Sequence, residues 1–381
     1  MTGEGGTAQV GMSLDPSSLV GGNRRVQLLT TALAVVLGLL FGAILIVLSN
    51  MSAGNGLNLA LPLEAYAALL DGSLGSVQAF GSTLNNATPL IFAGLAVTFG
   101  FRAGLFNIGA NGQFLVGAFC AVVVGSMSIA PFPLHLFVAL AAGFAGGAFW
   151  GFIPGILKAW RGAHEVVTTI MLNFIGYQLL NLLASTWFRD PSATFPKTRD
   201  VLPNAQLPIL IADTRLHAGI LLALLTAFIV WFVLFKTTRG FEIRTVGINP
   251  FAARYAGIRP GMITVLTMSI SGALAGLGGA AVNLGVTKTY PAEYIINYGF
   301  DGIAVALLGR AHPAGVVGAA LLFGALRAGA GSMQRATAIP TDIITIVQAF
   351  IILFVAAEAV LRRAIPWMRQ RRTPLAPAAA S

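Results

Sequence analysis

The polar residues best placed to do chemistry lie at four-residue intervals within an apolar stretch. They are Glu165, Thr169, Asn173, Tyr177 and Asn181. Residues four apart lie on one face of a helix, so these side chains form a single polar stripe. Because polar groups are costly against lipid, such a stripe on a membrane helix turns toward other helices or toward water. The stripe predicts either hydrogen bonds between helices or the lining of a passage, and the spacing does not choose between them.

A second concentration of polar residues lies in the run FRAGLFNIGANGQ, residues 101–113. Asn107 and Asn111 are about one helical turn apart, Gln113 follows, and three glycines loosen the backbone around them. Carboxamides both donate and accept hydrogen bonds, which suits contact with a neutral polar solute. They equally suit the repair of backbone groups where a membrane helix is interrupted. Both interpretations stay open.

One acid stands in the otherwise apolar run GFDGIAVALLG. It is Asp301, and the surrounding residues predict only a short helix at 299–309. An acid inside a membrane suggests proton coupling. An acid in the first turn of a short, capped helix is the simpler interpretation, because it opposes the positive end of the helix dipole.

The sequence gives no support for catalysis by this chain itself. None of the four lysines follows a glycine, as the phosphate-binding motif GxxxxGK[ST] requires. His164 and Glu165 begin like a zinc-binding HExxH, but position 168 is Thr. With four scattered histidines and the single cysteine Cys120, we expect no metal, no cofactor and no disulfide within the chain.

The composition places most of the chain in lipid. Of 381 residues, 56% are hydrophobic and only 9% are charged, and the mean hydropathy is +0.81. The 45 glycines suit a bundle of closely packed membrane helices. The net charge of +10 is not taken as a sign of nucleic-acid binding, because the basic residues fall mostly in short loops.

The fold class expected is therefore all-α, a polytopic membrane helix bundle with eight to ten transmembrane helices. Residues 1–23 are predicted to be a disordered cytoplasmic tail, 24–365 the membrane domain and 366–381 a second cytoplasmic tail. Spans are expected near residues 26–48, 84–101, 104–124, 134–157, 165–187, 216–235, 262–286, 314–331 and 343–361, with a short piece at 299–309. A patch at 62–70 is too short to span and is expected at the outer surface.

The positions of the basic residues predict which side each loop faces. With both termini in the cytoplasm, 16 of the 23 basic residues fall on the cytoplasmic side of this topology. Cytoplasmic loops of membrane proteins carry an excess of Lys and Arg. The long polar loop 236–260, which holds five basic residues, is therefore predicted to be cytoplasmic.

Within the loop 236–260, a short helix is expected. Asn249 suits the capping position, Pro250 the first turn, and Gly257 the stop. This helix would stand off the membrane and offer Phe251 and Tyr255 to a soluble partner. The alternative is a loop that faces anionic lipid.

Helix packing is predicted from glycines at regular spacing. Glycines 143, 147, 151 and 155 form a ladder in one span, and glycines 272, 276 and 279 form a similar set in another. Such faces let two backbones approach closely. A static contact is the simpler interpretation, and a face on which helices slide is the alternative.

Several runs together resemble a known family. They are PLIFAGLAVTFGFRAGLFNIGANGQF, HEVVTTIMLNFIGYQLLN, FPKTRDVLPNAQLP, GINPFAARYAGI and GFDGIAVALLGRAHPAGVVGAALLFGALRAG. They are similar to the permease subunits of bacterial ABC importers of the branched-chain amino acid and ribose class. The likeness is greatest to the nucleoside or simple-sugar branch, which works with a basic-membrane-lipoprotein-type binding protein. Where that family has an acid in GLFNIGxEGQ, this chain has Asn111.

The resemblance implies a multi-pass permease of the bacterial inner (plasma) membrane. Its implied partners are two cytoplasmic ABC ATPase subunits, a second permease subunit expected to be a different chain, and an extracytoplasmic solute-binding lipoprotein. ATP hydrolysis is expected in the ATPase subunits. The family's coupling helix carries over to the residues from 249 to 257, and the coupling positions named are Gly247, Asn249, Pro250, Ala252, Ala253, Tyr255 and Gly257.

The function expected is import of a neutral polar solute, a nucleoside in the first place. A simple sugar such as ribose is the alternative within the class, and an ion-coupled secondary transporter is the alternative outside it. The residues expected along the solute pathway are Asn107, Asn111, Gln113, Thr169, Asn173 and Tyr177. Either Ala253→Asp or Tyr255→Asp is expected to uncouple the ATPases while leaving the permease folded.

Overall fold

The computed structural model describes the backbone of residues 24–364 and the side chains of residues 29–355. The predicted tails, 1–23 and 366–381, lie outside the described residues. Over the described range the chain forms α-helices with no strand beyond isolated bridges, which confirms the all-α expectation. The helices are α1 (Arg24–Ser52), α2 (Leu61–Leu74), α3 (Val77–Arg102), α4 (Ala110–Gly125), α5 (Leu134–Arg161), α6 (Glu165–Ser185), α7 (Gly219–Lys236), α8 (Thr238–Ile248), α9 (Pro250–Tyr255), α10 (Pro260–Val282), α11 (Tyr298–Leu308), α12 (Pro313–Thr337) and α13 (Asp342–Ala364).

Seven described helices are long and apolar enough to cross a membrane. They are α1, α3, α5, α6, α7, α10 with the π-helical turn that follows it, and α12. Three shorter apolar helices lie at Ala110–Gly125, Tyr298–Leu308 and Asp342–Val355. The chain is thus a polytopic membrane protein, and the finer count of eight to ten spans stays a prediction.

Two boundaries differ from the sequence prediction. The third span was expected from Gly104, but α4 begins only at Ala110, and most of residues 103–109 form turns and coil. Gly104 has φ +71°, which a helix cannot contain, so the chain leaves α3 there. The patch at 62–70 lies in α2, a 14-residue helix whose residues Leu61, Ala65 and Leu69 are buried, and its predicted place at the outer surface stays a prediction.

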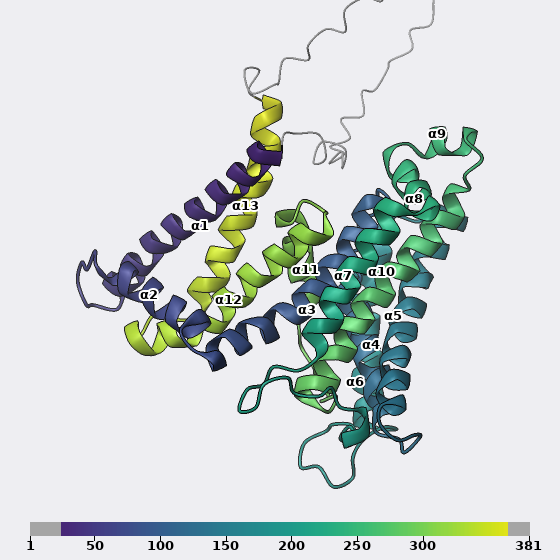
Figure 1. The fold of residues 1–381 in the computed structure, drawn as a ribbon, viewed down its shortest axis with the longest axis horizontal. Coiled ribbons are helices and arrows are strands. Elements are labelled where there is room, and N and C mark those ends of the chain that lie inside the picture. Colours follow the sequence, from purple (N-terminus) through teal and green to yellow (C-terminus); the bar gives the residue numbers. More distant parts are fainter. Residues whose placement is uncertain (1–23, 365–381) are drawn as a thin grey trace, which may run out of the picture.

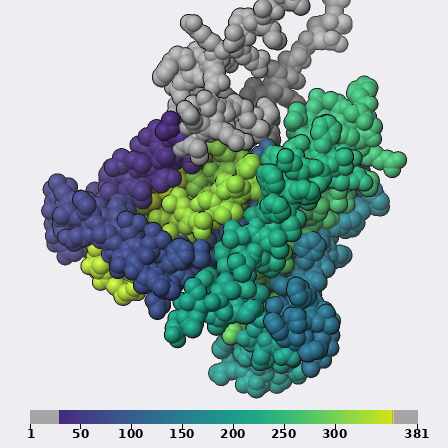
Figure 2. Space-filling model, in the orientation of Figure 1, coloured from purple at the N-terminus to yellow at the C-terminus, as the bar shows by residue number. Residues whose placement is uncertain are grey.

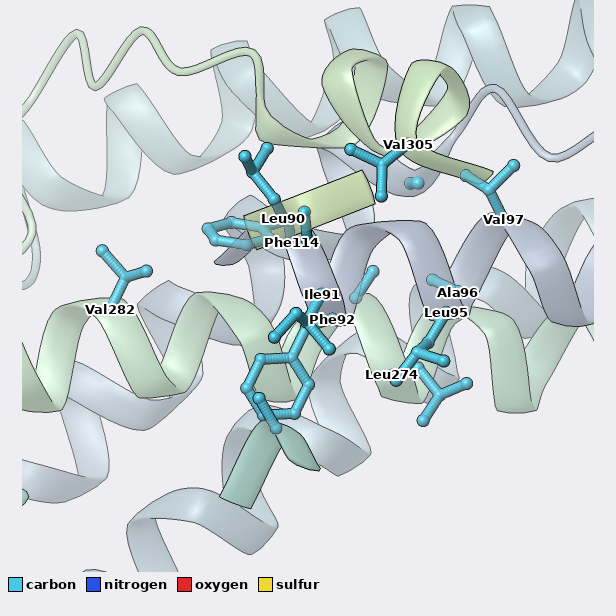
Figure 3. Packing of buried hydrophobic residues seen from close by; sticks show 14 of the residues in the cluster. Leu90, Ile91, Phe92, Leu95, Ala96, Val97, Phe114, Leu274, Val282 and Val305 are labelled. Atoms are coloured by element: carbon cyan, nitrogen blue, oxygen red, sulfur yellow. The ribbon is translucent and has the colours of Figure 1, made fainter. Parts of the chain in front are cut away.

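The core is built around α3 and α10. About three quarters of the most apolar window of each helix is buried, 78% for α3 and 72% for α10. Figure 3 shows Leu95 of α3 beside Leu274 of α10, and Leu90 of α3 beside Phe114 of α4. Val305 of α11 covers α3 from above. Because α3 and α10 are closely packed by other helices on most sides, the polar residues between them are held in fixed positions.

The glycine ladders of α5 and α10 form a very close helix contact. A methyl group added at Gly147 would overlap the carbonyl oxygen of Gly272, and one added at Gly276 would overlap that of Gly143. The two glycine faces of α5 and α10 therefore meet backbone to backbone, as the packing interpretation predicts.

The two ends of the bundle carry different segments. In Figure 1, α8, α9, the start of α1 and the end of α13 lie toward the top, and the loops 186–218 and 288–297 lie at the bottom. The bottom loops are joined, because the Thr198 amide donates to the Tyr290 carbonyl at 2.9 Å and Val201 to Lys288 at 2.8 Å. This grouping agrees with the loop sides predicted from charge. Which end faces the cytoplasm stays a prediction.

We predict opposite effects for two glycine-to-alanine substitutions in membrane helices. Gly147→Ala should lower stability by about 1–3 kcal/mol, because the added methyl overlaps the backbone of α10. Gly318→Ala is the matched control, since an added Cβ meets nothing within 4 Å, and alanine is the better helix former by about 1 kcal/mol. Thermal unfolding in detergent measures both. Equal melting temperatures for the two variants would contradict the close approach.

Candidate solute pathway and coupling segment

Residues 103–109 interrupt the helical chain between α3 and α4, and a network of side-chain hydrogen bonds holds this interruption in place. The Asn107 amide nitrogen donates to Gln113 Oε1 and to Ser271 Oγ, both at 2.8 Å. Its amide oxygen accepts from the Gly109 N–H at 3.0 Å. Ser271 in turn donates to the Ala96 carbonyl at 2.6 Å. Asn107 and Gln113 are almost fully buried, so their amides are used to join α3, α4 and α10.

The polar stripe on α6 turns toward this same interruption. Asn173 accepts from the Gly112 N–H at 2.8 Å and donates to the Ile108 carbonyl at 2.9 Å. Thr169 is buried one turn earlier and donates to the Glu165 carbonyl at 2.7 Å. The two Asn173 bonds leave α6, as the first interpretation of the stripe expects, whereas the Thr169 bond stays within α6. The alternative, that the stripe lines a passage, stays a prediction.

Of the remaining stripe residues, Glu165 is buried, and Tyr177 and Asn181 are half-buried. Glu165 forms an ion pair with Lys158 at the end of α5. Asn181 accepts a hydrogen bond at 3.3 Å from the Glu293 N–H, so the stripe reaches the segment before α11. Tyr177 is half-buried. Its hydroxyl group makes no hydrogen bond among the residues that the structure describes.

A second polar cluster, at the start of α11, was only partly seen in the sequence. Asp301 lies in the first turn, as the capping interpretation expects, but its carboxylate pairs with Arg327 of α12, with 2.7 Å between Oδ2 and Nη2. The Arg327 guanidinium also lies over the Tyr298 ring, 5.9 Å from its centroid. The sequence prediction gave Arg327 no role beyond its charge. The signal that marks it is one charge inside the apolar run ALLFGALRAGAG.

The interruptions before α4 and α11 meet. Asn111, in the first turn of α4, accepts a hydrogen bond at 3.1 Å from the Gly299 N–H of α11. Gly299 has no room for a side chain, because a methyl group there would overlap the backbone of Asn111. The start of each helix is therefore positioned by the other.

The predicted loop 236–260 is helical for most of its length. Residues 238–248 form α8, which the sequence prediction missed, and 250–255 form α9. The expected caps are confirmed: Asn249 Oδ1 accepts from the N–H groups of Phe251 and Ala252 at 2.9 and 3.1 Å, and Gly257 has φ +80°. Pro250 opens the helix. Figure 1 shows α9 at the upper corner of the molecule, beyond α8.

The predicted coupling residues divide into anchors and exposed groups. Ala253 is fully buried, and Gly247 lies so close to the Arg102 carbonyl that a side chain would overlap it. Tyr255 is 95% exposed and Phe251 76% exposed. Ala253→Asp would bury a carboxylate, so we now expect this variant to lose stability, and Tyr255→Asp is the variant that leaves the buried side of α9 intact.

An arginine and aromatic stack connects α8 with the central helices. The guanidinium groups of Arg244 and Arg102 lie over the Phe235 ring, 5.2 and 5.1 Å from its centroid. Arg102 also donates from Nε to the Ala311 carbonyl at 2.7 Å, in the turn between α11 and α12. Four elements, α3, α7, α8 and this turn, thus meet at one ring.

The sequence matches a known protein family over most of its length. Residues 79–356 match the family described as branched-chain amino acid transport system / permease component. The chain is 44% identical to the guanosine ABC transporter permease protein NupP of Bacillus subtilis, over 89% of this chain and 96% of NupP. It is 36% identical to the nucleoside ABC transporter permease protein NupB of Lactococcus lactis, over 90% of this chain and 94% of NupB.

A relative with another solute is also similar. The chain is 34% identical to the glucose ABC transporter permease protein TsgB13 of Haloferax volcanii, over 88% of each chain. No solved structure matches significantly. The family match, the long relatives and the seven candidate spans agree with one another. The chain belongs to the family of permease components of branched-chain amino acid transport systems, and it is a multi-pass protein of the inner membrane.

Proposed function

We propose that this chain is the permease subunit of an ATP-driven importer and that its solute is a nucleoside. The observation that carries the proposal is the 44% identity to a guanosine permease protein over 89% of the chain. The buried amides of Asn107, Gln113 and Asn173, which are bonded within the protein, fit a permease whose pathway walls must be held without water.

The proposed partners are two cytoplasmic ABC ATPases, a second permease subunit of different sequence and an extracytoplasmic solute-binding lipoprotein. α9 is the proposed docking element for an ATPase, because its two aromatic side chains project from a helix whose base is fixed by buried Ala253. Exposed aromatic groups are frequent anchors at protein interfaces. The coupling positions are those predicted from the sequence, with Gly247 and Ala253 acting as supports and Tyr255 as contact.

The proposed route of coupling runs through Phe235. Movement of α9 reaches α8, and from there Arg244, the Phe235 ring and Arg102 pass it to α3 and to the turn at Ala311. The ends of α3, α7 and α8 and the turn at Ala311 lie close together, joined by the contacts of Phe235 and Arg102. A push on α9 would therefore tilt the central helices relative to α11 and α12, which is the kind of change that alternating access needs.

The six predicted pathway residues take two roles in this proposal. Four have their polar groups bonded within the protein and hold the pathway wall, namely Asn107, Gln113, Thr169 and Asn173. Two keep a polar group without a hydrogen bond among the described residues, and these face the solute, namely Asn111 and Tyr177. A simple sugar is the second candidate solute, which the glucose relative favours.

We predict that membrane vesicles carrying the intact importer take up tritiated guanosine when ATP and the binding protein are both supplied. Uptake should continue with a protonophore present, and it should stop when ATP is replaced by a non-hydrolysable analogue. Excess glucose should leave it unchanged, whereas excess adenosine or uridine should compete. Uptake driven by an ion gradient without ATP would favour the secondary transporter, and competition by glucose alone would favour a sugar.

We predict that Tyr255→Asp uncouples the importer. The side chain is 95% exposed, so the protein should fold normally while a carboxylate replaces an aromatic contact in the ATPase groove. ATP hydrolysis stimulated by loaded binding protein should fall at least about tenfold, as expected for loss of an interface anchor. Trp160→Asp is the matched control. Trp160 is an aromatic residue that is 80% exposed, but it lies in the last turn of α5, beside Lys158 and Arg161, and not in α9. Unchanged stimulation in Tyr255→Asp would exclude docking at α9.

A further inference from the structure

The ion pair between Asp301 and Arg327 lies well inside the membrane. α11 has 11 residues, which at about 1.5 Å per residue gives a length of roughly 16 Å, half of a hydrocarbon core of about 30 Å. Its far end is the turn at Ala311, which Arg102 binds at the end of the α3 span. The first turn of α11, with Asp301, is therefore near the middle of the bilayer. Figure 1 places α11 centrally, between α12 and the group that contains α3 and α10.

This pair is not sealed in the protein. The Arg327 side chain is 28% exposed and that of Asp301 27% exposed in the single chain. Charged groups at the bilayer centre cost about 2.5–3.5 kcal/mol each on insertion scales, so they do not face lipid. The exposed parts face water or a second protein subunit. In Figure 2 the yellow-green residues around α12 fill the centre of the molecule between α1 and α2 on one side and α7 on the other.

Two interrupted helices begin beside the pair. The starts of α4 and α11 meet through Asn111 and Gly299. Asn111 is only 8% exposed, and its amide nitrogen makes no hydrogen bond among the described residues. Non-helical backbone at this depth is tolerated only inside protein or beside a wet cavity, and in transporters it marks solute sites. The Asn111 amide nitrogen is not enclosed by the protein, so its donors are available to a solute.

The side chains around the pair suit a nucleoside. The Tyr298 ring lies under the Arg327 guanidinium and beside the Phe114 ring, with 5.4 Å between the two ring centroids. A flat base stacks on aromatic and guanidinium surfaces. A carboxylate such as that of Asp301 accepts hydrogen bonds from the two neighbouring hydroxyl groups of ribose, and these charge-assisted bonds are strong.

We propose that Tyr298, Asp301 and Arg327, together with Asn111, form the contact site for a nucleoside halfway along the translocation pathway. The base stacks against Tyr298, and the ribose hydroxyl groups bind Asp301 while Arg327 holds the carboxylate in place. This inference rests on the proposed function. It adds to that function a specific site, none of whose three leading residues was among the predicted pathway residues.

The first experiment tests whether the site faces the pathway. A cysteine replaces Tyr298 in a Cys120→Ala chain, within the intact importer, and a charged methanethiosulfonate reagent labels thiols that contact water. Labelling of Tyr298→Cys should be slowed at least about fivefold when guanosine is saturating. Trp160→Cys is the control, because this side chain is 80% exposed in the last turn of α5 beside Lys158 and Arg161, and guanosine should not change its labelling. Absence of labelling at position 298 in every transport state would overturn the proposal.

The second experiment separates solute contact from a structural ion pair. Uptake of guanosine and of 2′-deoxyguanosine is measured for the wild type and for Asp301→Asn. The binding protein is the same in all assays, so its own selectivity cancels when the two permeases are compared. Asp301→Asn should lower guanosine uptake about tenfold, the loss expected for a hydrogen bond to a charged group, and 2′-deoxyguanosine uptake at least about threefold less. An equal loss for both solutes would mean a structural pair and would overturn the proposal.

Tyr298 supplies an independent comparison in case Asp301→Asn does not fold. Tyr298→Phe should keep guanosine uptake within about twofold, since the ring remains, and Tyr298→Leu should lose about tenfold, a typical cost of base stacking. Equal uptake by the two variants would overturn the stacking role. If the wild type imports glucose but not guanosine, the proposed nucleoside function fails. Protection of Tyr298→Cys by glucose would then still place the cluster on the pathway.

Discussion

The structure depends on one constraint, that backbone polar groups inside a membrane must be satisfied by the protein. The chain interrupts its helices at two depths where no water is assured, before α4 and before α11. Each interruption is repaired by carboxamides: Asn107 and Asn173 bind the backbone or neighbours around α4, and Asn111 binds the start of α11. Without these side chains the short helices would begin with unpaired N–H groups. The first role of these polar residues is therefore structural. Any contact with a solute depends on the positions in which they hold the starts of α4 and α11.

Close packing gives the rest of the bundle its rigidity. The glycine faces of α5 and α10 bring two backbones into contact, and α3 is enclosed by α10, α11 and α12. Such a block moves as a unit, because packed interiors resist continuous deformation. The Phe235 ring, near the end of α7, connects this block to α8, because Arg102 of α3 and Arg244 of α8 both lie over it. In the proposed importer, a change at α9 would reach the solute site through this contact, and α11 would be displaced relative to the rigid block.

Much of the fold follows from local patterns. Apolar runs bounded by charges placed most helices to within a few residues, and Asn249, Pro250 and Gly257 were sufficient to place α9, because caps act within one turn. The sequence prediction failed where contacts between distant residues override local sequence preference. The run 104–109 has apolar residues enough for a helix, yet Gly104 and the bonds to Asn107 and Asn173 make it an irregular connection. The polar composition of 238–248 suggested a loop, although it forms α8, whose buried Gly240, Ile243 and Val246 pack on the bundle.

The sequence by itself determined that this chain lies in a membrane, where most of its helices lie, and the family to which it belongs, because hydropathy, capping and motif are properties of neighbouring residues. Only the tertiary structure decided which polar groups are already bonded and which remain available. Asn107 and Asn111 are equivalent in the sequence, but the first is bonded to Gln113 and Ser271, while the amide nitrogen of the second makes no hydrogen bond to any described residue. Asp301 and Arg327 are 26 positions apart, and their pairing depends on how α11 packs against α12. Contacts between distant residues are set by packing, which no local pattern records.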